Sequence, residues 1–196
     1  MARHSQKPLS HYFPNQYDDE DAPKRGTFEY AKKWEPLAPR CTGHYRAPLS
    51  VGPGKVLATS YRAAVPEHYD GPQPDGGIYL ATEWLKRIGM IGTGIITGLR
   101  HPTVYIDWPD MTAPHLRYAQ LAVEWARERL DKGGAVEIAC VGGHGRTGTL
   151  TACLAVSYGH KPAEAIEYVR KGVCESCIET KSQKEFIHNF KRMRRE

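Results

Sequence analysis

Short apolar runs and segments of helical periodicity alternate along the chain from residue 55 onward. Glycine, proline or aspartate bounds the apolar runs, which is typical of strands in a sheet. The strands predicted in this way cover residues 55–61, 77–80, 95–99, 104–106 and 135–139. The last run is apolar enough to suit a strand that is buried in the interior of the domain.

Between these strands, apolar residues recur at helical spacing. In one segment they fall at Tyr118, Leu121, Ala122 and Trp125, and Pro114 stands just before its start, as is common at helix N-termini. The predicted helices cover residues 83–88, 115–130, 147–158, 163–171 and 181–193. Strands that alternate with helices predict an α/β fold with a central, mostly parallel, twisted sheet flanked by helices.

Residues 1–50 follow neither pattern. They are rich in proline, tyrosine, histidine and charge, and an acidic run at residues 18–21 is followed by Lys24 and Arg25. A segment without apolar periodicity does not build a core of its own. We therefore expect an N-terminal extension with little regular structure over residues 1–50 and one folded domain over residues 51–196.

The length, charge and cysteine content narrow the classes of protein further. The 196 residues suffice for one good-sized domain. A formal net charge of +5 is compatible with anionic substrates and does not by itself establish nucleic-acid binding. The five cysteines have no regular framework spacing, and no stretch has the roughly eighteen apolar residues of a membrane span. We expect a reducing, cytoplasmic setting, in which a reactive thiol persists.

Candidate chemistry concentrates in residues 140–148, which lie between a predicted buried strand and a predicted helix. Glycines here let backbone N–H groups turn inward, and the helix adds its positive N-terminal end. The result is a cradle of phosphate size. Its expected binding residues are Val141, Gly142, Gly143, His144 and Gly145. A cysteine at the mouth of such a cradle is shifted toward the thiolate form, which makes Cys140 a candidate nucleophile.

Three further side chains complete this candidate chemistry. Arg146 can hold two phosphate oxygens in a planar fork, which lysine does less well. Thr147 is placed to give a hydroxyl hydrogen bond to the sulfur when the sulfur becomes the leaving group. An alkoxide or phenoxide leaves poorly without a proton. Asp110 follows Trp108 and Pro109 after a predicted strand, so we expect it to protonate the leaving oxygen and later to take a proton from the attacking water.

The Cys-x5-Arg-Thr pattern that begins at Cys140, together with the Trp-Pro-Asp sequence that ends at Asp110, resembles the cysteine-dependent protein tyrosine phosphatase superfamily. Residues 77–85 are similar to the opening of its dual-specificity branch. The resemblance covers residues 55–190 and implies that residues 51–196 form a phosphatase catalytic domain. It also implies hydrolysis of phosphate monoesters with no metal and no other cofactor.

The resemblance implies a role for each matching residue. Cys140 would be the nucleophile, Arg146 the phosphate-binding residue and Asp110 the general acid. Residues 178–183 resemble the segment that positions the hydrolytic water in tyrosine-specific and related members, with Gln183 as the candidate.

The chain departs from the family pattern at two positions. Ala139 stands where the family usually has a histidine immediately before the nucleophile. Glu179 stands where tyrosine-specific members carry glutamine, and it is the second candidate for positioning water. Tyr45 and Tyr61 are the candidates for an aromatic clamp on phosphotyrosine.

Plainer interpretations stand beside these. The cradle can be a structural glycine turn, and Asp110 can be a turn or helix-capping residue, with Asp107 as the backup acid. His144 either contributes to substrate binding or points to solvent. Cys174 and Cys177 form a single Cys-x2-Cys pair that lacks the further ligands of a zinc site, and we favour reduced thiols over a redox pair.

The sequence favours hydrolysis of phosphotyrosine in proteins, with phosphoserine and phosphothreonine as further substrates, through a phosphocysteine intermediate. Two alternatives stay open: the same chemistry on a phosphoinositide, a nucleotide or an RNA 5′ end, and a non-catalytic phosphate-binding module. A cradle without lysine disfavours a multiply phosphorylated headgroup, and an intact Trp-Pro-Asp disfavours an RNA 5′ end, whose leaving group is already a phosphate. A non-catalytic module predicts loss of the cysteine, arginine or aspartate, and all three are present. The expected partner is a phosphorylated protein or peptide.

Overall fold

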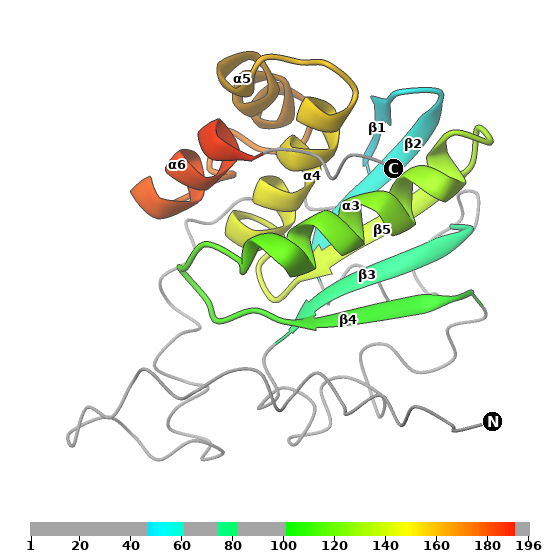
Figure 1. Ribbon diagram of the computed structural model, residues 1–196, viewed down its shortest axis with the longest axis horizontal. Helices are drawn as coiled ribbons and strands as arrows, with labels where there is room; N and C mark the ends of the chain where they lie inside the picture. Colours follow the sequence, from blue (N-terminus) through cyan, green and yellow to red (C-terminus); the bar gives the residue numbers. More distant parts are fainter. Residues whose placement is uncertain (1–46, 61–73, 82–100, 191–196) are drawn as a thin grey trace, which may run out of the picture.

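The computed structural model describes residues 47–60, 74–81 and 101–190 (Figure 1). Within these ranges, five strands form one sheet in the order β1-β2-β5-β3-β4. They are β1 Ala47–Val51, β2 Gly54–Ser60, β3 Gly76–Ala81, β4 Thr103–Asp107 and β5 Ala135–Cys140. Strand β1 runs antiparallel to β2, whereas β2, β5, β3 and β4 are parallel to one another. The prediction of a mostly parallel central sheet is confirmed.

The described helices pack together over one face of this sheet (Figure 1). They are α3 Leu116–Leu130, α4 Gly145–Ser157, α5 Pro162–Gly172 and α6 Lys181–Asn189. Helix α4 lies in the middle, because it contacts the other three helices as well as β2 and β5. Every residue of α4 from Gly145 to Ala155 is buried. Such all-round burial explains why this helix, apart from Arg146, is built of small and apolar residues.

Side chains alternate between the two faces of the sheet along the central strand β5. Val136, Ile138 and Cys140 belong to the hydrophobic core under the helices. Glu137, one position out of phase, is fully buried on the other face, where it accepts a 2.5 Å hydrogen bond from the Tyr79 hydroxyl. Cys140 is the last residue of β5 and therefore lies at the carboxyl end of a central parallel strand. Open α/β sheets bind their ligands at such strand ends.

Two boundaries differ from those predicted. Strand β1 straddles residue 50, so the folded domain includes residues 47–50, which are held by pairing with β2 and carry too short a pattern to be recognised. Helix α6 ends at Asn189 and not at residue 193, because Phe190 is extended, with φ −65° and ψ 125°. The extended backbone buries the Phe190 ring, which is 4 % exposed and lies 6.0 Å from the Phe186 ring, centroid to centroid.

Part of the sequence prediction lies outside the described residues. The helix at 83–88, the strand at 95–99 and the extension up to residue 46 belong to this part, as do Tyr45 and Tyr61. Among the helices that the structure describes, none combines the length and the apolar character that crossing a membrane requires.

Candidate active site

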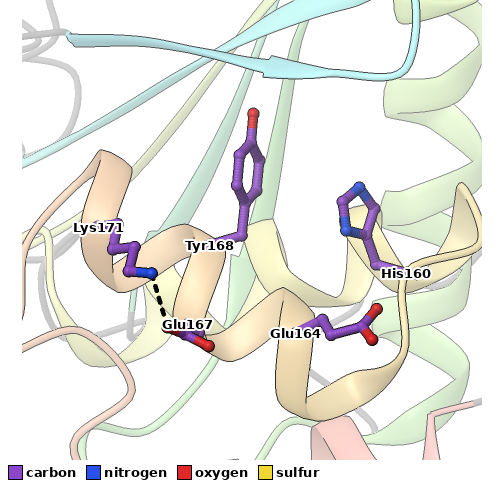
Figure 2. A pocket seen from close by; sticks show the side chains of 5 residues that line it. All are labelled: His160, Glu164, Glu167, Tyr168 and Lys171. Carbon is purple, nitrogen blue, oxygen red and sulfur yellow. Dashed lines mark ion pairs between the residues drawn. The ribbon is translucent and has the colours of Figure 1, made fainter.

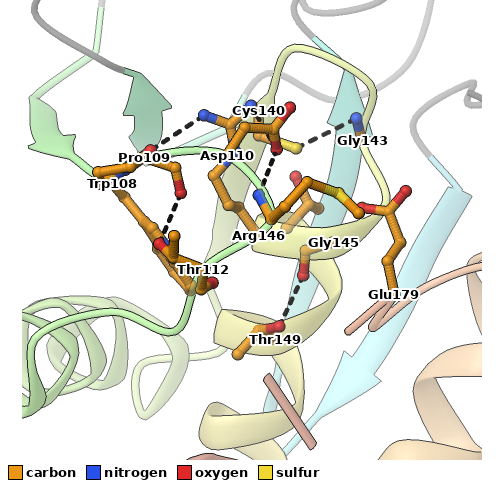
Figure 3. Close-up of polar contacts among 12 residues, drawn as sticks. Trp108, Pro109, Asp110, Thr112, Cys140, Gly143, Gly145, Arg146, Thr149 and Glu179 are labelled. Atoms are coloured by element: carbon orange, nitrogen blue, oxygen red, sulfur yellow. Dashed lines mark hydrogen bonds and ion pairs between the residues drawn. The ribbon is translucent and has the colours of Figure 1, made fainter. Parts of the chain in front are cut away.

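The loop after β5 curls around the sulfur of Cys140 (Figure 3). The backbone N–H of Gly143 donates to Cys140 Sγ at 3.2 Å. Gly143 has a φ of +75°, and a Cβ atom on it would lie 2.9 Å from the backbone N of Ser60. Glycine alone satisfies both conditions without strain. The sequence between strand and helix therefore folds as expected, with a backbone donor aimed at the candidate nucleophile.

Arg146 connects this loop to the Trp-Pro-Asp sequence. Its side chain is 2 % exposed, and its Nη2 lies 3.2 Å from Asp110 Oδ1. Its Nη1 donates to the carbonyl oxygen of Trp108 at 3.0 Å. The Asp110 side chain is half exposed, and its Oδ1 also accepts from the Met111 N–H at 3.0 Å. Cys140, Arg146 and Asp110 thus come together from two separate segments, as the sequence predicts.

Residues 108–112, here called the acid loop, are fixed by contacts at both ends. The Trp108 ring is 2 % exposed, and its Nε1–H donates to the Thr112 carbonyl at 3.0 Å. The Thr112 hydroxyl donates to the Pro109 carbonyl at 2.8 Å, and Gln183 Nε2 on α6 donates to the Thr112 carbonyl at 3.3 Å. The acid loop is therefore closed onto the cradle. The Asp110 carboxylate and a bound phosphoryl group would therefore compete for Arg146 Nη2.

Gln183 is fully buried, and both ends of its side-chain amide contact backbone. Its Oε1 accepts from the N–H groups of Glu179 at 2.8 Å and Thr180 at 3.2 Å. The Thr180 hydroxyl in turn accepts from the Gln183 N–H at 3.2 Å, which completes a capping box at the start of α6. Gln183 therefore joins the start of α6 to the acid loop.

Glu179 precedes α6, and its carboxylate is turned toward the cradle although the residue as a whole is exposed (Figure 3). The carboxylate lies so close to Gly145 that a Cβ atom on Gly145 would collide with Glu179 Oε2. Burial raises the pKa of the Glu179 carboxyl, and the negative charge of Asp110 raises it further, whereas Arg146 and the Gly145 N–H act in the opposite direction. Two carboxylates, Asp110 and Glu179, thus share one site.

The remaining predicted residues lie around the same loop. The Thr147 hydroxyl donates to the Thr59 carbonyl on the neighbouring strand at 3.3 Å, and its hydrogen bond to the departing sulfur stays a prediction. His144 is 4 % exposed, which makes the interpretation that it points to solvent wrong. Gly142 is half-buried, and Val141 is 40 % exposed at the rim of the cradle.

Sequence reasoning missed Thr59 and Thr112. Thr59 accepts from Thr147 and lies against Gly143 of the cradle, and Thr112 accepts from Trp108 and Gln183. Both residues act through a backbone carbonyl. Every residue type has one, so the amino-acid sequence does not reveal this role. The one available signal was the position of Thr59 near the end of a predicted strand.

Of the other cysteines that the structure describes, Cys153 and Cys177 belong to the hydrophobic core and Cys174 packs against it. Cys153 is fully buried in α4, and this burial raises the pKa of its thiol. Cys177 Sγ lies 4.0 Å from the Gly143 carbonyl, and Cys174 Sγ accepts from the Ser176 N–H at 3.3 Å. Within the described ranges, no three His, Cys, Asp or Glu side chains are grouped so as to hold a metal ion.

A separate hollow lies on the outer side of α5 (Figure 2). Its lining residues are His160, Glu164, Glu167, Tyr168 and Lys171. The rings of His160 and Tyr168 stack with centroids 5.4 Å apart, and Lys171 Nζ lies 2.7 Å from Glu167 Oε1. Since the lysine is matched by an acid, this hollow offers no excess positive charge to a phosphate. The candidate chemistry is therefore that of the cradle and the acid loop.

Comparisons with known proteins agree with this geometry. A family model described as "Polymorphic toxin system, DSP-PTPase phosphatase" matches residues 85–160. The Uncharacterized protein MJ0215 of Methanocaldococcus jannaschii is 36 % identical over 121 residues, which are 61 % of this chain and 73 % of that protein.

Solved structures are similar in fold at low sequence identity. A kinase associated phosphatase whose catalytic cysteine is replaced by serine superimposes with a TM-score of 0.59 at 16 % identity, over 72 % of this chain and 90 % of that one. PTPMT1 in complex with PI(5)P superimposes with a TM-score of 0.55 at 20 % identity, over 74 % of this chain and 94 % of that one.

Proposed function

Because this chain belongs to the cysteine-dependent protein tyrosine phosphatase superfamily and is dual-specificity-phosphatase-like, we propose that it hydrolyses phosphate monoesters through a phosphocysteine intermediate on Cys140. One observation carries the proposal. The cradle and the acid loop converge, with the Gly143 N–H 3.2 Å from Cys140 Sγ and Asp110 Oδ1 3.2 Å from Arg146 Nη2. A nucleophile, a phosphate-binding fork and an acid are the groups that this reaction needs.

In the first step, the Cys140 sulfur attacks phosphorus, so that an S–P bond forms and the ester P–O bond breaks. Asp110 gives its proton to the leaving oxygen, which departs as an alcohol or phenol. Arg146 exchanges the Asp110 carboxylate for two phosphate oxygens. It keeps its 3.0 Å hydrogen bond to the Trp108 carbonyl, which holds the acid loop in place during the exchange.

In the second step, water attacks the phosphorus, the S–P bond breaks, and phosphate and the thiolate are released. Gln183 and Glu179 are the candidates for positioning this water. Thr147 is the candidate for stabilising the departing sulfur, a role that requires its hydroxyl to leave the Thr59 carbonyl, 3.3 Å away. His144 and the other residues of the cradle contribute backbone and buried polar groups around the phosphate.

We propose phosphotyrosine in proteins or peptides as the main substrate, with phosphoserine and phosphothreonine as further substrates. The support is the rim of the cradle, where Val141 is 40 % exposed and Met111 47 % exposed. Exposed apolar side chains beside the phosphate site suit an aromatic leaving group. The phosphoinositide bound by PTPMT1 makes a lipid headgroup the second candidate, but residues 141–145 contain no lysine to meet additional phosphates. We place the reaction in a reducing, cytoplasmic setting, which keeps the thiol available.

The test is to trap the intermediate. The protein is mixed with a radiolabelled phosphotyrosine peptide and quenched in acid, and the labelled residue is identified. We expect label on Cys140, none in Cys140→Ser, and normal labelling in the control Cys174→Ser. Near-normal hydrolysis of an aryl phosphate by Cys140→Ser would contradict the proposed function. Parallel assays of phosphoserine peptides, phosphoinositide vesicles and nucleotides rank the substrate classes.

A further inference from the structure

The segment before α6 is built so that one carboxylate reaches the cradle. Ile178 has a φ of +63°, a left-handed conformation that a β-branched residue rarely adopts. Its side chain is fully buried, and the Arg170 guanidinium of α5 donates to the carbonyls of Cys177 at 3.0 Å and Ile178 at 3.1 Å. Strained backbone held by several contacts often marks a functional position. Here the strain turns Glu179, the next residue, toward the cradle.

The cradle is in turn shaped to accept this carboxylate. Gly145 has no Cβ, and any Cβ there would collide with Glu179 Oε2 and lie 2.9 Å from Gln183 Nε2. The Gly145 N–H also donates a hydrogen bond to the Glu179 carboxylate. The Glu179 N–H is fixed to Gln183 Oε1 at 2.8 Å, so that the backbone cannot easily turn away. Figure 3 shows Glu179 on the opposite side of the cradle from Trp108.

The charged groups around Glu179 come from the acid loop and from the helices α4, α5 and α6. Asp110 of the acid loop and Arg146 of α4 act on it with opposite sign. Arg170 of α5 is engaged with the carbonyls immediately before Glu179. On α6, which begins two residues after Glu179, the Lys181 Nζ is directed to Glu185 Oε1 at 3.5 Å and so is partly neutralised. Glu179 therefore sits between one acid and one buried guanidinium.

We propose that Glu179 is a second catalytic carboxylate, which accepts the proton of the water that attacks the phosphocysteine. The inference rests on the proposed function. Asp110 ends the first step ionised. In the second step, the water oxygen bonds to phosphorus, the S–P electron pair returns to Cys140, and one water proton passes to Glu179. That proton then moves to Asp110, which is again ready to act as an acid.

This assignment differs from that of a glutamine at the same place. An amide can orient water but cannot take its proton at neutral pH. The side-chain amide of Gln183, the other candidate, is already hydrogen-bonded to the acid loop and to the backbone just before α6. A carboxyl whose pKa is raised by its surroundings is also a stronger base than an ordinary carboxylate. Glu179 thus has the position and the basicity that the second step requires.

The experiment measures the second step directly in Glu179→Gln, with Glu185→Gln on the following helix α6 as the matched control. Each protein is labelled with a radioactive phosphotyrosine peptide and chased with unlabelled peptide. The label on Cys140 is then followed over time. We expect the phosphocysteine to decay about 10-fold or more slowly in Glu179→Gln, because general-base catalysis is lost while Asp110 remains as a weaker substitute. Labelling should be as fast as in the unaltered protein, and Glu185→Gln should match that protein in both steps.

The pH dependence provides a second readout that a purely structural role would not change. The rate of phosphocysteine decay should lose one ionisation on its acid side in Glu179→Gln, and Glu179→Asp should recover part of the rate. Decay in Glu179→Gln that is as fast as normal, or slowing of both steps together, would overturn the inference and leave the proposed function intact. Hydrolysis that survives in Cys140→Ser would instead overturn the proposed function itself.

Discussion

Replacing Asp110 by asparagine separates the acid from its structural contacts. Asparagine has nearly the same shape as aspartate. In the unaltered protein, Asp110 Oδ1 lies 3.0 Å from the Met111 N and 3.2 Å from Arg146 Nη2, and an asparagine Oδ1 can accept both hydrogen bonds. What it lacks is the charge and the proton. The variant therefore tests whether the carboxyl works as an acid or merely ties the acid loop to Arg146.

The expected effect of Asp110→Asn on the free energy of unfolding is much smaller than its expected effect on the reaction barrier. The Asp110 side chain is 50 % exposed, and a partly exposed ion pair contributes only about 0.2–1 kcal/mol. The free energy of unfolding should therefore fall by less than about 1 kcal/mol, and less still because the two hydrogen bonds survive. Loss of an acid catalyst costs about 10²–10⁴-fold in rate. That loss corresponds to about 2.8–5.6 kcal/mol in the barrier, at about 1.4 kcal/mol for each factor of ten.

The assay compares kcat/KM for a series of aryl and alkyl phosphates whose leaving groups differ in basicity. Asp110→Asn should lose most activity on the most basic leaving group and least on a good one, because only the former needs a proton. Asp107→Asn, at the end of β4, is the control for the alternative acid. Equal losses across the series would refute the reasoning, as would a larger loss in the Asp107 variant.

Other consequences of the geometry are open to measurement. Gly143→Ala should lower the free energy of unfolding by at least about 1–2 kcal/mol, the cost of a left-handed conformation for a residue with a Cβ; unchanged urea denaturation would show that the cradle can relax. Glu179→Gln should alter how stability depends on pH. The raised pKa of Glu179 means that the folded protein holds this proton more tightly than the unfolded chain, so stability falls as pH rises from the ordinary glutamate pKa of 4.5 through the raised value. Because Glu179→Gln cannot hold this proton, the variant should be more stable than the unaltered protein at pH values above the raised pKa. At pH values below 4.5 it should show no such gain. Parallel pH profiles of urea denaturation for the two proteins would contradict this prediction.

The sequence alone predicted the elements whose local hydrophobic pattern agrees with the tertiary packing. The helix predicted at residues 115–130 is observed as Leu116–Leu130, and the run at 135–139 is observed as Ala135–Cys140. Both segments have a clear period and clear ends. Cys140 and Asp110 lie at the same edge of the sheet, because Cys140 ends β5, Asp110 lies three residues beyond the end of β4, and the carboxyl ends of parallel strands share an edge.

Details that depend on distant backbone could not be predicted. The direction of the Thr147 hydroxyl is decided by the Thr59 carbonyl on the neighbouring strand β2. The placement of Glu179 depends on Ile178, whose left-handed backbone is stabilised by Arg170 from another helix. No periodicity or residue preference encodes such contacts. The sequence therefore identified Glu179 as a departure from the family pattern without revealing that its carboxylate lies on Gly145.

The proposed mechanism requires one proton in this site before each first step, and the balance of charge favours its retention. Arg146 is the buried cation between them, with Asp110 Oδ1 3.2 Å away and Glu179 within electrostatic reach. A bound phosphomonoester brings about 1.5 to 2 further negative charges at neutral pH, and like charges so close together disfavour the fully ionised state. The first step of the proposed mechanism requires one proton on Asp110. Once the leaving group has taken it, the attacking water is the source that can replace it, and Glu179 is placed to receive it. In the proposed mechanism the two steps are therefore linked through a single proton, which an amide in place of Glu179 could not carry.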